Sequence, residues 1–257
     1  MCELFGVSAS KRTEVNSQLQ EFFSHSVHHP NGWGMAVFHN GIASIEKEPV
    51  RADRSRYLKE RLKTKIAVYD MIAHIRLATK GAIEYENCHP FVQQDNYGRR
   101  WTLAHNGTMF QCPVLDPYYY KQEGSTDSER ILCYLIDRIN DRQEELGRPL
   151  EEEERFAFLE EVVASIAEGN KLNLLLYDGE LMYVHTNYAD SLYYQEFADG
   201  AFFATVPLGK ALWKPVPFTR LLAWKAGKKV YAGTSHGHEY IDNEKDMEFL
   251  FLDSSSL

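Results

Sequence analysis

The 257-residue sequence has only four cysteines, and none of them shows the C-x-x-C spacing that is typical of zinc sites and redox motifs. They are Cys2, Cys88, Cys112 and Cys133. In a reducing compartment, cysteines with such spacing remain thiols rather than pairing as disulfides. We therefore expect four free thiols.

Long apolar runs and an excess of basic residues are missing as well. No stretch approaches membrane-spanning length, and no N-terminal signal peptide is recognisable. The net charge is -9, whereas a general nucleic-acid surface or an anionic-membrane surface needs clustered Lys and Arg. We therefore expect a cytoplasmic protein that binds neither nucleic acid nor membrane.

Internal repeats, low-complexity linkers and breaks in composition are also absent, so we expect a single domain that spans residues 2–257. Hydrophobic residues make up 44% of the chain and aromatic residues 13%, which is the composition of a globular protein with a substantial core. A chain of this length is long enough for one large domain or two small ones, but the sequence offers no boundary between two.

Hairpin signals dominate both ends of the chain. Asn40-Gly41 separates two extended runs, and an Asn-Gly pair favours the positive φ angles of a tight turn. Three similar turns follow in the last third. The expected hairpins are 33–39 with 42–47, 172–177 with 181–185, 192–197 with 201–206, and 221–225 with 229–233. Further strands are expected at 3–9, 67–75 and 101–105, the last ending in a turn at Asn106-Gly107.

Helical periodicity appears near the start and in the middle of the chain. Helices are expected at 13–25 with Thr13 as N-cap, at 54–63, after the capping box at 126–129, and at 156–167. The segments 77–98, 108–125 and 141–154 are expected to be irregular, and 108–125 is long enough to be a functional lid. Strands at both ends with helices between them predict an α+β fold, in which two antiparallel sheets pack face to face with helices outside.

Cys2 directly follows the initiator Met1, whose removal we expect because the Cys2 side chain is small. Cys2 would then carry both a thiol and a free α-amine, and the amine could act as base for the thiol. The run Leu4 to Val7 reads as a buried strand that would fix this terminus in a core. The alternative is an ordinary edge strand with an incidental thiol.

Three other segments put polar side chains at the ends of apolar runs. Arg76 could bind a carboxylate through two parallel hydrogen bonds, or it could form a structural salt bridge. The Asn106 amide and the Gly107 N–H could form an oxyanion hole, or they could simply end a strand. Asp127 could hold an ammonium group, or it could only complement a helix N-terminus. Each signal is weak by itself.

Together, and in this order, the motifs resemble those of the class II glutamine amidotransferases, which have an N-terminal nucleophile. Members of that family carry a catalytic Cys after a processed Met, an Arg-(aromatic)-Ala-Thr-(His)-Gly strand end, an Asn-x-His-Pro loop, a His-Asn-Gly turn and a Thr-Asp-(Ser/Thr)-Glu helix start. The matching segments here are Cys2, 76–81, 87–90, 105–107 and 126–129. With the segment 32–36 and the total length added, the chain is similar to the stand-alone, YafJ-like members.

The resemblance implies a four-layer αββα sandwich of the Ntn-hydrolase type and a role for each matched residue. Cys2 would be the nucleophile, with its own α-amine as base, and Asn106 and Gly107 would bind the oxyanion. Arg76, Thr79, Lys80, His89 and Asp127 would bind the substrate. Among them, Arg76 with Thr79 would bind the α-carboxylate of glutamine and Asp127 its α-ammonium group.

The implied activity is that of a glutamine amidotransferase or glutaminase. Cys2 would attack the side-chain amide of glutamine, ammonia would leave, and water would release glutamate from a γ-glutamyl thioester. The resemblance implies no metal and no cofactor. Nothing like a synthase domain follows in the sequence, so a separate protein would have to bind an ammonia acceptor. The oligomeric state is left open, with a homodimer as one option.

Two residues depart from the pattern of the synthase-fused family members, and they leave a second activity open. Leu77 replaces an aromatic residue and Lys80 replaces a His. Lys80 could pair with a carboxylate or allow longer γ-glutamyl compounds. A γ-glutamyl peptide or conjugate amidohydrolase with the same Cys2 mechanism is therefore the alternative, with the tyrosines 118–120 lining the exit of a larger leaving group.

Two further alternatives come from other classes of protein. A metal-dependent hydrolase could use histidines, among which His236-x-His238 has ligand-like spacing, although no H-E-x-x-H helix is present. A non-catalytic subunit could also retain the fold. The joint presence of Cys2, Arg76, Asn106, Gly107 and Asp127 argues against a non-catalytic role, and histidines in turns are usually only solvated.

Overall fold

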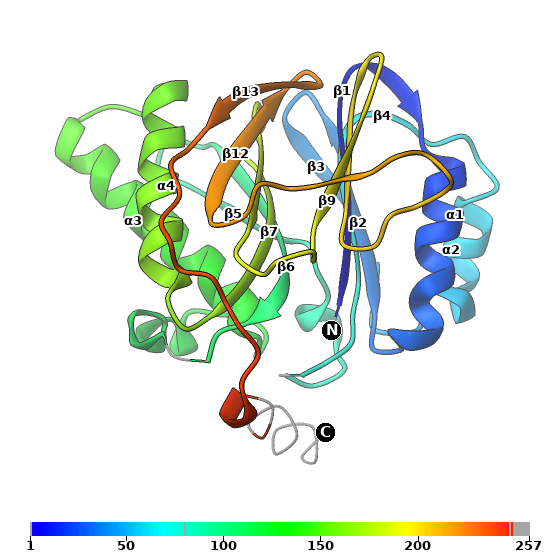
Figure 1. Ribbon diagram of the computed structural model, residues 1–257, viewed down its shortest axis with the longest axis horizontal. Coiled ribbons are helices and arrows are strands. Elements are labelled where there is room, and N and C mark those ends of the chain that lie inside the picture. Colours follow the sequence, from blue (N-terminus) through cyan, green and yellow to red (C-terminus); the bar gives the residue numbers. More distant parts are fainter. Residues whose placement is uncertain (1, 80, 111, 247, 249–257) are drawn as a thin grey trace.

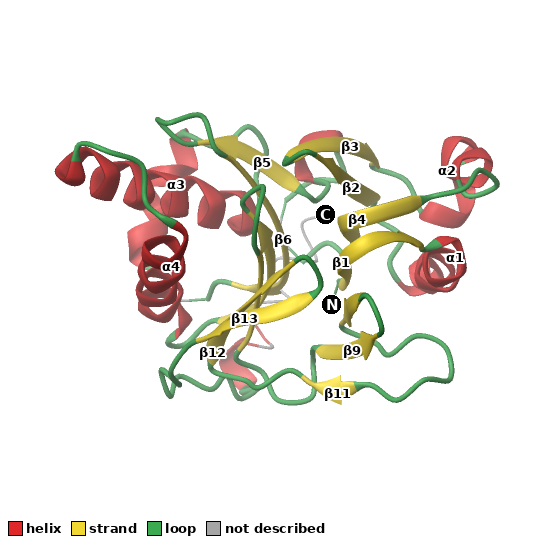
Figure 2. Cartoon of the chain, turned by 90° about the horizontal axis from the view of Figure 1, so that it is seen from above, coloured by secondary structure: helices red, strands yellow, loops and turns green. Residues whose placement is uncertain are grey.

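The described strands form two antiparallel sheets that lie face to face, with a pair of helices on each outer side (Figure 1 and Figure 2). The structure is a computed structural model, and it describes residues 2–79, 81–110, 112–246 and 248. The expected α+β fold, a four-layer αββα sandwich, is confirmed. The helices are α1 (Asn16–Ser24) and α2 (Arg56–Arg61) beside one sheet, and α3 (Asp127–Leu146) and α4 (Glu152–Ala167) beside the other.

Within the described residues, one sheet has seven strands and the other has six. The order in the first is β11 (Lys214–Pro215), β9 (Tyr193–Phe197), β10 (Gly200–Ala204), β1 (Glu3–Glu14), β4 (Ala67–Ile75), β2 (Trp33–His39) and β3 (Ile42–Glu48). The order in the second is β13 (Lys228–Ala232), β12 (Arg220–Lys225), β8 (Met182–Thr186), β7 (Lys171–Tyr177), β6 (Arg100–Thr108) and β5 (Phe91–Gln94).

Short 3-10 helices link these elements at η1 (His25–His28), η2 (Ala52–Arg54), η3 (Tyr85–Asn87) and η4 (Pro113–Tyr120). None of the helices in the described part of the chain is long and apolar enough to cross a membrane.

β1 lies at the centre of its sheet, between β4 and β10. Side chains of a strand alternate between its two faces. Leu4 accordingly belongs to the apolar layer between the sheets, whereas Phe5 and Val7 belong to the layer under α1 and α2. All three side chains are fully buried. The start of the chain is therefore fixed in the core, as the run of apolar residues predicted.

β1 is longer than expected, and this corrects the prediction for the first helix. After an irregularity beyond Ser8 the strand pairs again with β4, so that Thr13 lies opposite Val68. Thr13 is therefore a strand residue, and its prediction as an N-cap was wrong. α1 begins at Asn16, after Val15, with no side-chain cap.

Three other boundaries differ from the prediction. Phe91–Gln94, inside the segment expected to be irregular, pairs with β6 as the edge strand β5. α3 continues to Leu146, so the irregular connector before α4 is much shorter than 141–154. β6 continues through Asn106 and Gly107 to Thr108, so these two residues lie within a strand rather than in a turn.

Candidate active site

Cys2 stands directly before β1, at the edge of the interior. Two residues before the inward-facing Leu4, it lies by alternation on the side of the sheet that faces β6. The half-buried thiol accepts a hydrogen bond from the Leu77 N–H at 3.4 Å and lies 3.4 Å from the Leu77 carbonyl oxygen. Thr205 supports the position from the other side, because its hydroxyl accepts a hydrogen bond from the Leu4 N–H at 3.0 Å.

The charge environment of Cys2 links it to two other predicted site residues. Burial raises the pKa of the Cys2 thiol, and the charge of Asp127 acts in the same direction. The hydrogen bond from Leu77 and the charge of Arg76 lower that pKa but do not outweigh burial. Arg76 and Asp127 are therefore both within electrostatic reach of the sulfur. A base is needed to form thiolate near neutral pH.

Arg76 follows β4 and is almost fully buried. Its guanidinium donates hydrogen bonds to the carbonyl oxygens of Ala82 at 2.8 Å and Gly81 at 2.9 Å. Burial lowers the pKa of the guanidinium, while the charges of Cys2, Cys88 and Asp127 raise it. The loop after β4 therefore wraps around a buried positive charge beside Cys2.

Asn106 and Gly107 lie near the end of β6, paired with β7. Asn106 is buried, and its Oδ1 has no hydrogen-bond partner among the described residues. Gly107 has no room for a side chain, because a Cβ there would lie 1.9 Å from the carbonyl oxygen of Lys171. The glycine is thus required by the close approach of β7 and not by a turn.

Asp127 is the first residue of α3 and is also buried. Its Oδ2 accepts a hydrogen bond from the Met109 N–H at 2.8 Å, just after β6 ends. Thr126 caps α3 by accepting a hydrogen bond from the Glu129 N–H at 3.2 Å. The predicted capping box is only half formed, since the Glu129 carboxylate accepts instead from the N–H groups of Glu123 and Gly124.

His105 and Asn87, to which the sequence assigned no role, connect the segments that carry the predicted site residues. His105 Nε2 lies 3.1 Å from the Lys171 carbonyl, so Nε2 carries the proton and Nδ1 accepts from the Ser128 hydroxyl at 2.9 Å. His105 thereby joins β6 to the start of α3. The motif His105-Asn106-Gly107 drew attention to His105, but the sequence did not show that its hydrogen-bond partner is Ser128.

Asn87 is the second such residue, and it is fully buried. Its Nδ2 donates to the Ala82 carbonyl and to the Ser125 hydroxyl, both at 2.9 Å. Its Oδ1 accepts from the Ser125 N–H at 2.7 Å. Because Ala82 also binds the Arg76 guanidinium, Asn87 connects the loop around Arg76 to the turn before Asp127.

For the other predicted substrate-binding residues, Thr79, Lys80 and His89, the structure shows no hydrogen bond with Cys2 among the described residues. Thr79 lies half-buried in the loop after Arg76, and Lys80 lies outside the described residues. His89 is buried beside His74, with ring centroids 4.0 Å apart, and its Nδ1 accepts from the His105 N–H at 3.4 Å. Burial lowers the pKa of His89 well below its usual value, so the ring is neutral. Its role in substrate binding stays a prediction.

The histidines of the metal alternative do not gather into one site. Within the described ranges, no group of three or more His, Cys, Asp or Glu side chains could hold a metal ion. His236 instead meets His185, with 3.0 Å between the two Nε2 atoms. The His238 N–H donates to His236 Nδ1 at 3.1 Å.

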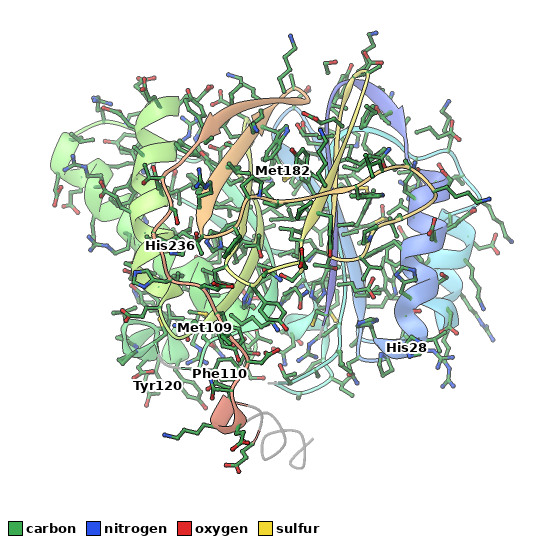
Figure 3. All side chains as sticks on the ribbon, in the orientation of Figure 1. His28, Met109, Phe110, Tyr120, Met182 and His236 are labelled. Carbon is green, nitrogen blue, oxygen red and sulfur yellow. The ribbon has the colours of Figure 1, made fainter. Side chains whose placement is uncertain are left out.

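The cysteine end of the molecule lies at the lower edge of the two sheets in Figure 1, where the N-terminus is marked. Met109 and Phe110, which directly follow β6, lie at the same edge in Figure 3, with Tyr120 of η4 beside them. Tyr120 is 90% exposed. The predicted lid segment therefore contains a 3-10 helix, which packs against α3.

Comparisons with known proteins show the family to which the chain belongs. The model of the family described as glutamine amidotransferases class-II matches residues 1–198. A protein of Methanocaldococcus jannaschii described as uncharacterized is 30% identical over 259 residues, which cover 90% of this chain and 71% of that protein. The putative glutamine amidotransferase YafJ of Escherichia coli is 29% identical over 192 residues, with 73% and 74% covered.

A solved structure resembles the fold of the chain. It is described as a predicted glutamine amidotransferase from Pseudomonas aeruginosa, and its TM-score is 0.66. Its sequence is 21% identical, and the match covers 90% of this chain and all of that one. At this identity the likeness concerns the fold alone.

Proposed function

Because this chain belongs to the class II glutamine amidotransferases, we propose that it cleaves the side-chain amide of glutamine with Cys2 as nucleophile. The observation that carries the proposal is the position of Cys2 at the end of a central strand, within reach of the charges of Arg76 and Asp127. A zwitterionic amino acid carries a carboxylate that can pair with Arg76 and an ammonium group that can pair with Asp127. The two residues would therefore select it over a neutral amide.

The proposed reaction begins with removal of Met1, which leaves a free α-amine on Cys2. Burial raises the pKa of the thiol, so thiolate forms only when a base takes the proton, and the amine of the same residue is within reach. The thiolate attacks the δ-carbonyl carbon of glutamine. The Asn106 amide and the Gly107 N–H stabilise the negative charge that develops on the carbonyl oxygen.

Collapse of the tetrahedral intermediate breaks the C–N bond, and the ammonium group of Cys2 gives its proton to the leaving nitrogen. Ammonia departs, and a γ-glutamyl thioester remains on Cys2. The amine then takes a proton from water, which attacks the thioester and releases glutamate and the thiol. In the absence of an acceptor for the ammonia, the chain acts as an amidohydrolase.

A γ-glutamyl peptide or conjugate is the second candidate substrate, because it differs from glutamine only in its leaving group. The observation that favours it is the aromatic side of η4, where Tyr119 is 60% exposed and Tyr120 90% exposed. Tyr120 appears in the same part of the view as Met109 and Phe110 in Figure 3, and an exposed aromatic surface there would contact a leaving group larger than ammonia.

The test compares the hydrolysis of glutamine and of a γ-glutamyl dipeptide by the purified full chain, after mass spectrometry has shown whether Met1 is gone. Cys2→Ala is expected to lower turnover by roughly 10⁴-fold or more, since the nucleophile is lost. The matched control is Cys112→Ala, because Cys112 is also half-buried but has a pKa raised by burial to about 11. Undiminished turnover in Cys2→Ala would refute the proposal, and cleavage of the dipeptide alone would favour the second substrate.

A further inference from the structure

Two buried asparagines face each other across the pairing of β6 and β7. Asn106 and Asn173 are direct partners in the register of the two strands. Both lie two positions from residues of the layer between the sheets, Ala104 on β6 and Leu175 on β7, so both point into that layer. Side chains of such cross-strand partners are close enough to interact.

The amide of Asn173 has a defined orientation. One of its terminal atoms lies 2.5 Å from the Thr186 hydroxyl and 3.2 Å from the Ser191 hydroxyl. A separation of 2.5 Å suits an O–H···O hydrogen bond and is too short for N–H···O, so this atom is the carbonyl oxygen Oδ1. Thr186 lies toward β8, on the side of β7 opposite to β6. The amide nitrogen Nδ2 therefore points toward β6 and Asn106.

The two asparagines have complementary unmet hydrogen bonds. Asn173 Nδ2, a donor, and Asn106 Oδ1, an acceptor, are both buried without a partner among the described residues. A buried polar group without a hydrogen-bond partner is unfavourable. A hydrogen bond between these two atoms would therefore be stabilising. Hydrogen bonds of this kind are often long before substrate binds and shorten in the reactive complex.

We propose that Asn173 is a positioning residue for the reaction: its Nδ2 holds the carbonyl oxygen of Asn106, so that Asn106 turns its own NH₂ toward the oxyanion. This inference rests on the proposed function of Asn106. An unrestrained Asn106 amide could rotate and offer an oxygen, which would repel the developing negative charge. Thr186 and Ser191 support the same orientation by holding the other end of Asn173.

Another buried asparagine of this region shows what a purely structural role looks like. Asn187 is as fully buried as Asn173. Its Oδ1 accepts from the Leu172 N–H at 2.8 Å, and its Nδ2 donates to the backbone carbonyls of Ala167, Asn170 and His238. Both ends of its amide are therefore satisfied, which makes Asn187 a suitable control.

The test is steady-state kinetics of Asn173→Asp on whichever γ-glutamyl amide the wild-type chain cleaves. Aspartate keeps the acceptor for Thr186 and removes the N–H donor. We expect kcat to fall about 100-fold, as for the loss of one oxyanion donor, with KM changed less than about threefold because Arg76 and Asp127 are untouched. Asn173→Ala removes the same donor without a buried charge, and it serves if the aspartate variant does not fold.

Two comparisons separate positioning from stability. Asn187→Ala is expected to lower the unfolding temperature and leave kcat within about twofold. In a chain that already carries Asn106→Ala, Asn173→Asp should cause no further fall in kcat, because the group through which it acts is gone. An unchanged kcat in both Asn173 variants, or a full second loss in the double variant, would overturn this inference. Undiminished turnover in Cys2→Ala would instead overturn the proposed function and leave the two results distinguishable.

Discussion

At the scale of single residues, Asn87 connects two parts of the candidate site although it is not itself expected to touch substrate. It is the common anchor of the loop around Arg76 and of the turn before Asp127. We predict that Asn87→Ala raises KM for glutamine about tenfold or more, which corresponds to about 1.4 kcal/mol of binding free energy, with a smaller effect on kcat.

The control for this prediction is Asn16→Ala on the far side of the first sheet. Asn16 also makes three hydrogen bonds, from Nδ2 to the carbonyls of Leu62 and Thr64 and from the Ile66 N–H to Oδ1. Its loss should lower stability without changing KM. Equal KM values for the Asn87 variant and the wild type would contradict the anchoring role.

Single residues also mark the limit of what the sequence could predict about the site. Cys2, Arg76, Asn106, Gly107 and Asp127 follow from short motifs, because each lies beside a recognisable strand or helix end. The partners that orient them lie far along the chain or carry no motif. Asn87 forms a hydrogen bond with Ser125, 38 residues further along the chain, and Asn173 lies inside an otherwise largely apolar strand where no motif marks it. Only the assembled sheets bring these groups together.

At the scale of elements, β6 shows why the predicted strand end was wrong. An Asn-Gly pair after an apolar run usually reports a turn, since both residues tolerate positive φ. Here the glycine is needed for a different reason, because the backbone of β7 leaves no space for a Cβ. The sequence shows the glycine but not that the Lys171 backbone lies against it. A glycine needed for a turn and a glycine needed for close strand packing could therefore not be told apart from the sequence.

A C-terminal strap, defined here as residues 233–246, lies over the segment that follows β6. The Tyr240 ring stacks on Phe110, with centroids 5.6 Å apart and planes at 7°. The buried Lys171 also contacts the strap, since its Nζ lies 5.4 Å from the centroid of the Tyr240 ring and 3.6 Å from an oxygen of Asp242. The strap lies beyond residues 1–198, which the family model matches.

We predict that Tyr240→Ala raises KM for glutamine about three- to tenfold. Loss of the ring removes the packing that holds Phe110, and with it the adjacent Met109 N–H that binds Asp127. Tyr240→Phe keeps the ring and loses only the hydroxyl that donates to Asp246, so its KM should stay within about twofold of the wild type. If both variants have the wild-type KM, the strap does not support the site.

At the scale of the whole molecule, the layers could be predicted but the order of the strands could not. Four hairpin turns indicate antiparallel sheets with helices outside, and that much is confirmed. The centre of the first sheet instead pairs the start of the chain with β10, where Leu4 and Thr205 are hydrogen-bonded 201 residues apart. No local pattern reports such a pairing, because its free energy comes from burial of β1 between distant strands.

The packing of the whole molecule also buries several histidines as neutral rings, which makes stability depend on pH. Burial lowers the pKa of His74, His89 and His105 from the usual value, and that of His185 to about 3. In the unfolded chain these rings bind protons below about pH 6.5. The unfolded state therefore takes up more protons than the folded state as the pH falls, and the free energy of unfolding decreases.

Asp70 opposes this trend over part of the range. Burial raises the pKa of its carboxyl to about 6, so the folded chain binds a proton there that the unfolded chain does not bind until about pH 4. Between pH 6 and 5 the histidines of the unfolded chain thus hold several protons that the folded chain lacks, against one proton that folded Asp70 holds. At about 1.4 kcal/mol per proton and pH unit, the histidines outweigh Asp70, and we predict a net loss of unfolding free energy on the order of a few kcal/mol.

Urea unfolding of the full chain at pH 7, 6 and 5 measures this loss. Such a loss is a large share of the roughly 5–15 kcal/mol that stabilises a typical domain, so the urea midpoint should fall steeply below pH 6. Asp70→Asn removes the opposing proton and should increase the loss of unfolding free energy between pH 6 and 5 by about 1 kcal/mol. A urea midpoint that stays constant from pH 7 to 5 would contradict this prediction. It would mean that the buried histidine rings, His74 and His89 among them, become protonated in the folded chain.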